Sequence, residues 1–258
     1  MRIVVVPGAF TSATAFDGFA AQLEAEGHDV TVVELPARSS RVPQLLGGGL
    51  SRIDAALDEI VRDLPDGDLV LVGHSLGGLA CLRAARRWSA EGSDRRRPRG
   101  VALLTPAPPG GLATEVVQLL RRDPASALKF AALAVTSTPV PVPGVEMKPP
   151  RGLFTDRVTE QELEASVEHR RDESWLLLGQ LMVGSREDVR RLDVPALVVG
   201  GDEDGLVPAA TCARLAEQLG ARYEQLPVGH AFAEEAAGQV VTDVLLDWLR
   251  SLPRASRR

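Results

Sequence analysis

Cysteine and histidine are scarce in this sequence, and their scarcity excludes several kinds of site. The 258 residues include two cysteines and four histidines, with no close cysteine pair and no cluster of His and Cys at metal-ligand spacing. We therefore expect neither a disulfide framework nor a structural zinc site. Cys81 and Cys212 have small and apolar neighbours, where a thiol behaves as a small buried hydrophobe. Because this usage suits a reducing compartment, we expect a cytoplasmic protein.

Long apolar runs and a large excess of positive charge are also missing. A membrane span of about eighteen apolar residues is absent, so no membrane is expected as a partner. The opening MRIVVVPGAF has too few apolar residues before Pro7 for a secretory signal, and it is interpreted as a strand. The net charge is −6, and the basic run at 95–99 is interpreted as a solvated loop, so no nucleic acid is expected either. The oligomeric state is left open, and a homo-oligomer is compatible with the sequence.

Short β-branched runs alternate with longer helical patterns, which is typical of an α/β protein with a mostly parallel sheet. Most of the six runs are continuously apolar, so we expect helices on both faces of the sheet. The expected strands are Arg2–Val6, Asp29–Leu35, Asp68–Gly73, Gly100–Thr105, Pro195–Gly200 and Arg222–Leu226. The expected helices are Ala15–Glu26, Leu50–Asp63, Gly77–Ser89, Ala209–Gly220 and Glu234–Leu252.

One region breaks this alternation, because residues 107–191 contain no good strand and two proline clusters. Thr159 and Glu162 have capping-box spacing, which indicates a helix start within it. We interpret the region as a helical cap inserted into a core of residues 1–106 and 192–258. Substrate selection should come from the cap, although most of its apolar residues are expected to pack on the core. Those residues include Leu119, Leu120, Phe130, Leu133, Phe154, Trp175, Leu178 and Met182.

The stretch GHSLG matches the pattern G-x-S-x-G directly after an apolar strand and directly before a helical segment. In such a turn the serine backbone is strained, so the residues two before and two after it must be small. The hydroxyl of Ser75 then stands clear of the backbone at the start of a helix. The same glycines would also suit a plain strand-to-helix turn, so the rest of the chain has to decide.

A serine hydroxyl becomes a good nucleophile when a base takes its proton and an acid orients that base. In this topology the acid and then the histidine follow later strands, and the carboxyl ends of parallel strands share one edge of the sheet. Asp204 follows the fifth expected strand and His230 follows the sixth. Asp202 is the alternative acid. His74 adjoins Ser75, but the turn should aim its side chain elsewhere.

Two further histidines fit the role of base poorly. His28 lies in a helix-to-strand turn at the opposite edge of the sheet, and His169 lies in a charged helix of the insertion. The oxyanion then needs two N–H donors. We expect them to be the backbone N–H groups of Leu76 and of Ala9, with that of Phe10 as a substitute. An ordinary turn at PGAF would use the same residues.

Four segments, VVVPGAF, LVLVGHSLGGLA, LVVGGDEDGLVP and LPVGHAF, together resemble the α/β-hydrolase superfamily in order and spacing, and they bracket nearly the whole chain. The likeness to its single-domain esterases and hydroxynitrile lyases implies that the two N-terminal strands of larger members are missing. The chain departs from the family pattern at Pro7, where many members have His, and at ELPARSSR, which replaces Asp-x-Pro-Gly-x-Gly-x-Ser. Both departures bear on substrate and rate.

These residues predict a serine hydrolase that cleaves a carboxylic ester or thioester of a small-to-medium apolar substrate through an acyl-enzyme. Such chemistry implies a small-molecule substrate and neither a metal nor an organic cofactor. A lyase, a C–C bond hydrolase or a biosynthetic cyclase could use the same triad, and a non-catalytic binding protein of this fold is a further alternative. Haloalkane dehalogenases and epoxide hydrolases need Asp at this position, so Ser75 argues against both classes.

Overall fold

The computed structural model describes residues 1–35, 48–65, 67–91, 97–122, 124–125, 127–128, 149–171, 173–185 and 187–253. Several sequence interpretations therefore fall wholly or partly outside the described residues. These are the ELPARSSR segment from residue 36, the start of the basic run at 95–99, the cap residues Phe130 and Leu133, and the tail from residue 254.

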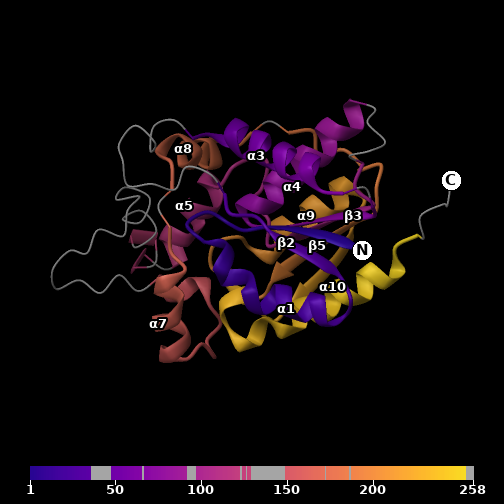
Figure 1. Ribbon diagram of the computed structural model, residues 1–258. Helices are drawn as coiled ribbons and strands as arrows, with labels where there is room; N and C mark the ends of the chain where they lie inside the picture. The colour runs from indigo at the N-terminus through magenta and orange to yellow at the C-terminus, as the bar shows by residue number, and fades with distance from the viewer. Residues whose placement is uncertain are drawn as a thin grey trace.

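Six strands form one sheet in the order β2-β1-β3-β4-β5-β6, and every pairing in it is parallel (Figure 1). This arrangement confirms the α/β class and makes the sheet wholly rather than mostly parallel. The four inner strands are almost completely buried, whereas the edge strands β2 and β6 are partly exposed. The strands are β1 (Arg2–Val6), β2 (Asp29–Val32), β3 (Leu69–His74), β4 (Gly100–Leu104), β5 (Ala196–Gly201) and β6 (Arg222–Leu226).

Helices cover both faces of the sheet, as the apolar strands predict (Figure 1). Successive strand residues point to opposite faces, so Val4 contributes to one core and Val5 to the other. One core lies against α3 (Leu50–Asp63), α4 (Leu76–Ala90) and α9 (Ala209–Leu219). The other lies against α1 (Asp17–Ala25) and α10 (Gln239–Ser251).

Several expected elements are shorter in the structure than the sequence indicated, the second strand and the last helix most instructively. β2 was expected to reach Leu35 but ends at Val32, because its neighbour β1 ends just before Pro7. The last helix was expected from Glu234, but α10 begins five residues later. The intervening chain forms two short 3-10 turns, because Glu235 is extended and its carboxylate binds the N–H and hydroxyl groups of Thr155. Those turns are η3 (Phe232–Glu234) and η4 (Ala236–Gly238).

Between β4 and β5 the described residues form helices and turns, and their one strand-like feature is an isolated bridge between Thr11 and Arg170. The capping box at Thr159 and Glu162 is confirmed, since each side chain bonds the other residue's backbone. The division into core and cap at residues 107 and 191 stays a prediction. The elements of this insertion are α5 (Ala113–Arg122), η2 (Arg151–Leu153), α7 (Glu160–Glu168) and α8 (Trp175–Val183).

The apolar residues of the insertion divide between the core and the surface. Leu119 and Phe154 are buried, and Leu178 packs against the core under α3 and α4. Leu120 and Trp175 are about half exposed, at 50% and 51%. Most of the named residues that the structure describes therefore pack inward, as expected. Over the same described part of the chain, each helix is too short or too polar to cross a bilayer.

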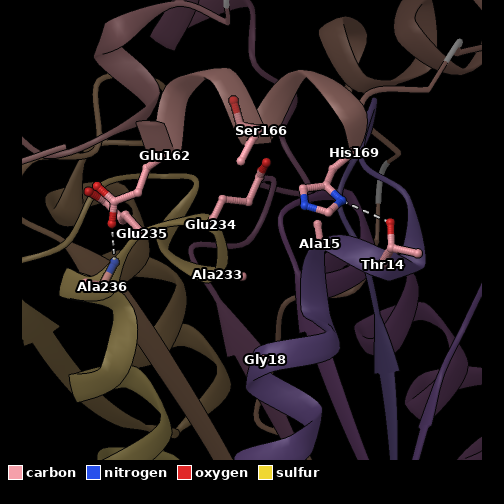
Figure 2. Close-up of a pocket in the computed structure, with 11 residues that line it drawn as sticks. Thr14, Ala15, Gly18, Glu162, Ser166, His169, Ala233, Glu234, Glu235 and Ala236 are labelled. Atoms are coloured by element: carbon pink, nitrogen blue, oxygen red, sulfur yellow. Dashed lines mark hydrogen bonds between the residues drawn. The ribbon is translucent and has the colours of Figure 1, made fainter. Parts of the chain in front are cut away.

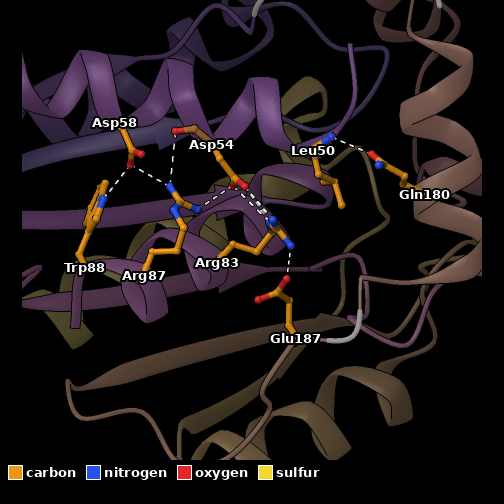
Figure 3. Close-up of polar contacts among 8 residues, drawn as sticks. All are labelled: Leu50, Asp54, Asp58, Arg83, Arg87, Trp88, Gln180 and Glu187. Carbon is orange, nitrogen blue, oxygen red and sulfur yellow. Dashed lines mark hydrogen bonds and ion pairs between the residues drawn. The ribbon is translucent and has the colours of Figure 1, made fainter. Parts of the chain in front are cut away.

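Ion pairs join α4 both to α3 and to the chain that leads into β5 (Figure 3). Arg83 binds the carboxylate of Asp54 at 2.7 Å and also pairs with Glu187 beyond α8. Arg87 pairs with Asp54 at 2.8 Å and with Asp58 at 2.8 Å. These ion pairs hold Glu187, near the C-terminal end of the insertion, against the face of the sheet that carries α3 and α4.

Both cysteines lie in the core of the protein. Cys81 in α4 and Cys212 in α9 are free and buried. Burial in apolar surroundings raises the pKa of each thiol far above its usual range. Both residues therefore act as small apolar side chains in the core, which confirms the sequence interpretation.

Candidate active site

Ser75 occupies a sharp turn between the end of β3 and the start of α4. Its φ is 51° and its ψ is −116°, a strained conformation for a residue with a side chain. The flanking glycines make the turn possible. A Cβ on Gly73 would lie 2.2 Å from the carbonyl oxygen of Gly77, and a Cβ on Gly77 would lie 1.9 Å from that of Val6. The spacing of the motif is therefore a packing requirement of the turn.

Three sequence-predicted residues meet at this turn through side-chain hydrogen bonds. The Nε2 atom of His230 lies 3.0 Å from the Oγ of Ser75, and its Nδ1 lies 2.7 Å from Oδ2 of Asp204. An ionised carboxylate can only accept, so Nδ1 carries the hydrogen and the neutral ring presents Nε2 as acceptor to the serine hydroxyl. All three residues are buried, with at most 8% of each exposed. The structure thus forms a Ser–His–Asp chain from loops after β3, β5 and β6.

The two neighbouring aspartates differ clearly in placement. Asp204 is held by two backbone donors, because its Oδ1 accepts from the N–H groups of Leu206 at 2.8 Å and Val207 at 2.7 Å. Those bonds leave Oδ2 facing His230. Asp202 is exposed and binds the side chain of Gln225 on β6 instead. Asp204, the first choice from the sequence, is thus the carboxylate against the imidazole.

His74 contacts the loop that carries His230, a contact that the sequence did not indicate. Its Nε2 lies 2.8 Å from the carbonyl oxygen of His230, so the ring donates to that backbone atom. The rings of Phe16 and Phe232 enclose it on other sides, at centroid distances of 5.6 and 5.4 Å. Burial, and then the neighbouring His230, keep the pKa of His74 well below its usual value. The neutral ring therefore donates to the His230 backbone, and among the described residues no hydrogen bond joins it to Ser75.

The other two histidines lie away from the serine. His169 ends α7 and its Nδ1 lies 3.0 Å from the hydroxyl of Thr14. His28 follows α1, and burial lowers the pKa of its ring. Neither has a recorded contact with Ser75 among the described residues, in agreement with the elimination made from the sequence.

The loop after β1 lies against the serine turn. A Cβ on Gly8 would lie 2.8 Å from Nδ1 of His74 and 3.1 Å from the Ser75 Cβ, so a side chain at this position would crowd the serine turn. Phe10 has a φ of 60°, and its N–H donates to the carboxylate of buried Glu173 at 3.3 Å. Within the described chain, no acceptor is recorded for the N–H groups of Ala9 and Leu76. Within that part of the chain the expected donor pair is thus unengaged, whereas the N–H of the substitute Phe10 is occupied.

A pocket of about 310 Å³ opens between η1 (Ala13–Phe16), α7 and η3 (Figure 2). Ser75 is not among its lining residues. Its carboxylates already have partners: Glu162 accepts from the N–H of Ala236 at 2.8 Å, and Glu235 binds the Thr155 hydroxyl at 2.7 Å. Among the described residues, no group of three or more His, Cys, Asp or Glu could hold a metal ion.

A match over nearly the whole chain shows which sequence family the protein belongs to. A model of the alpha/beta hydrolase family matches residues 3–244. The chain belongs to the alpha/beta hydrolase family. This α/β hydrolase is also 36% identical over 86 residues to Methylesterase 3 of Arabidopsis thaliana. That match covers 32% of this chain and 33% of the relative, so the chain spans about a third of the length of the curated relative that it matches.

Solved structures with the same fold cover most of this α/β hydrolase. A bromoperoxidase from Bacillus anthracis matches with a TM-score of 0.71 and 18% identity, over 96% of this chain and 91% of its own. An esterase from Exiguobacterium antarcticum matches with a TM-score of 0.70 and 17% identity, over 97% of this chain and 92% of its own. At these identities the likeness shows the fold.

Proposed function

We propose that this protein is a serine hydrolase that cleaves carboxylic esters through an acyl-enzyme. The observation that carries the proposal is the buried chain of contacts from Ser75 through His230 to Asp204. A hydroxyl, an imidazole and a carboxylate in this order activate the hydroxyl as a nucleophile. Membership of the α/β hydrolase family and the partial identity to a methylesterase support the same chemistry.

In the first half-reaction, Ser75 Oγ attacks the ester carbonyl carbon while His230 Nε2 takes the hydroxyl proton. The charged imidazolium is stabilised by Asp204, whose Oδ2 accepts from Nδ1 at 2.7 Å. Collapse of the tetrahedral intermediate breaks the bond to the alcohol, and His230 returns the proton to the leaving oxygen. The acyl group then remains on Ser75.

In the second half-reaction, water attacks the acyl carbon and gives its proton to His230. The intermediate collapses to the free carboxylic acid, and the proton returns to Ser75 Oγ. In both halves, negative charge develops on the former carbonyl oxygen. The N–H groups of Leu76 and Ala9, which have no recorded acceptor among the described residues, are the donors that we assign to it.

The substrate class that we propose is an ester of small-to-medium size with an apolar acyl group. Apolar side chains of the insertion, such as buried Phe154 in the segment packed on the His230 loop, support an apolar acyl group. The partial match to a methylesterase supports a small alcohol. Thioesters would fit the same nucleophile and oxyanion donors.

The test uses the whole protein, an active-serine phosphonate probe and a panel of p-nitrophenyl esters. Wild type should bind one equivalent of probe on Ser75, identified by mass spectrometry, and should hydrolyse short-chain esters. Ser75→Ala should lose both labelling and turnover while keeping its unfolding midpoint. Ser51→Ala is the matched control, because Ser51 is exposed on α3, and this variant should behave like wild type. Turnover retained by Ser75→Ala would exclude the proposed mechanism.

A further inference from the structure

A short piece of the insertion runs antiparallel to the loop that follows β1. Two backbone hydrogen bonds join them: Ser12 N–H donates to the His169 carbonyl oxygen at 2.8 Å, and Arg171 N–H donates to the Phe10 carbonyl oxygen at 2.9 Å. The residues between these two bonds form the isolated bridge. We call residues 169–171 the bridge segment. It holds the loop on which the proposed oxyanion donor lies.

The side chain of Arg170 extends from the bridge segment to η3. Its Nη2 donates to both carboxylate oxygens of Glu234, at 2.8 and 2.7 Å. Both side chains are nearly enclosed, with 10% of Arg170 and 4% of Glu234 exposed. Figure 2 shows Glu234 pointing toward α7 near His169. Removing either member of such a buried pair leaves the other charge buried without a partner, which is strongly destabilising. The pair therefore holds the two segments together.

Glu234 belongs to the same loop as the imidazole base. It ends η3, and its N–H donates to the carbonyl oxygen of Ala231, the residue after His230, at 2.9 Å. Phe232 of this turn packs on His74, the ring that supports the His230 backbone. A displacement of Glu234 would therefore shift the backbone next to His230.

We propose that Arg170 is a positioning residue that fixes the loop of Ala9 relative to the loop of His230. Its backbone pairs with Thr11 of the first loop, and its guanidinium binds Glu234 on the second. This inference rests on the proposed function, because hydrolysis needs the oxyanion donor and the base placed together. A displacement of about 1 Å can lower such a rate by about 100-fold. No contact with substrate is assigned to Arg170.

The first variant is Arg170→Met, which keeps much of the side-chain length and removes the donor. We expect kcat for p-nitrophenyl butyrate to fall by about 10- to 100-fold, with KM changed by less than about threefold. Activity is expressed per site titrated with the phosphonate probe, so that unfolded protein does not count. Arg170→Lys, whose ammonium group can still pair with Glu234, should recover part of the loss.

A second variant separates the effect on loop position from the effect on stability. It is needed because Arg170→Met leaves the buried carboxyl group of Glu234 without its partner. In R170M/E234M no charge is left unpaired, so the unfolding midpoint should return toward that of wild type. Its kcat should stay low, since apolar contacts do not fix a direction as hydrogen bonds do. Arg83→Met is the matched control. It removes a half-buried arginine from the network of Figure 3, away from both loops, and should lower the midpoint without changing kcat.

The outcomes distinguish this inference from the proposed function. A wild-type kcat per titrated site in Arg170→Met would overturn the positioning role. So would a kcat that recovers together with the unfolding midpoint in R170M/E234M, which decides the matter if the single variant does not fold. Neither result would touch the role of Ser75. An active Ser75→Ala variant would instead remove the proposed function on which the inference rests.

Discussion

His74 and His230 are joined by a hydrogen bond from the ring of one to the backbone of the other. Nε2 of His74 lies 2.8 Å from the carbonyl oxygen of His230, and the two ring centroids are 4.9 Å apart. The residue next to Ser75 in sequence therefore supports the backbone of His230, which lies 155 residues further along the chain than Ser75. This contact also couples the serine turn to the imidazole loop directly.

Replacing His74 should slow turnover without weakening substrate binding. In His74→Phe the ring shape is kept but the donor is lost, and the buried carbonyl oxygen of His230 is left unsatisfied. We expect kcat per titrated site to fall by about 10- to 100-fold, with KM little changed. His74→Gln, whose amide can donate, should retain more activity. Equal kcat values in both variants and wild type would contradict this support role.

Changing the two aspartates separately should give very different results. Asp204→Asn should lower kcat by a factor on the order of 10³ to 10⁴, because the amide no longer holds the imidazole in the tautomer that accepts from serine. Asp202→Asn is the matched control, since Asp202 is exposed and contacts Gln225, and its kcat should stay within about twofold of wild type. Ester turnover at neutral pH measures both. A large loss in Asp202→Asn alone would reverse the assignment.

Adding one methyl group at Gly77 should damage the fold at the serine turn. The new Cβ would lie 1.9 Å from the carbonyl oxygen of Val6, and backbone atoms cannot rotate away as a side chain can. We expect Gly77→Ala to lower the free energy of unfolding by about 3 kcal/mol or more.

Gly179→Ala is the matched control for that substitution. Nothing lies within 4 Å of a Cβ built at this exposed position of α8. The change should leave stability unaltered or raise it by up to about 1 kcal/mol, because alanine favours a helix. Urea unfolding compares the two variants, and similar midpoints would show that the contact at Gly77 is relieved elsewhere.

The stability of the fold should fall as the pH is lowered through the range where His74 would ordinarily gain a proton. Burial lowers the pKa of His74 in the folded state, so below about pH 6.5 the unfolded chain binds a proton that the folded chain does not. The free energy of unfolding therefore decreases toward acid, with a slope of at most about 1.4 kcal/mol per pH unit.

The contribution of His74 to this slope is the difference between wild type and His74→Gln. Burial raises the pKa of Glu234 and of Glu235, which works in the opposite direction and is common to both proteins. Urea unfolding between pH 5 and 7 should therefore show a steeper acid loss in wild type. Parallel curves would mean that His74 gains its proton at the same pH in the folded and unfolded states, which would contradict a lowered pKa.

The sequence predicted the sheet and the triad for the same physical reason. Buried parallel strands have a strong apolar signal, and their carboxyl ends share one edge, so the loops holding Asp204 and His230 could be placed beside Ser75. The contact between Arg170 and Glu234 had no such signal. It depends on how a helical insertion without strand pattern folds back onto a turn 64 residues away.

Local pattern also failed where a distant partner decides the backbone. The stretch from Glu234 to Gly238 is rich in helix formers, yet it forms 3-10 turns. Glu235 is drawn to Thr155 of the insertion, and Gly238 lies so close to Phe232 that a Cβ would stand 1.8 Å from its carbonyl oxygen. Periodicity describes one segment at a time and holds no information about such approaches.

The sheet order has a consequence for how the protein is made. β6, the last of the six described strands along the chain, lies at the edge of the sheet beside β5, and the loop after it carries His230. A ribosome releases the serine turn long before this strand, so the nascent chain holds Ser75 without His230 for most of its synthesis. Under the proposed mechanism the hydroxyl gains its base only when β6 docks on β5, so a nascent chain that ends before β6 should not hydrolyse esters.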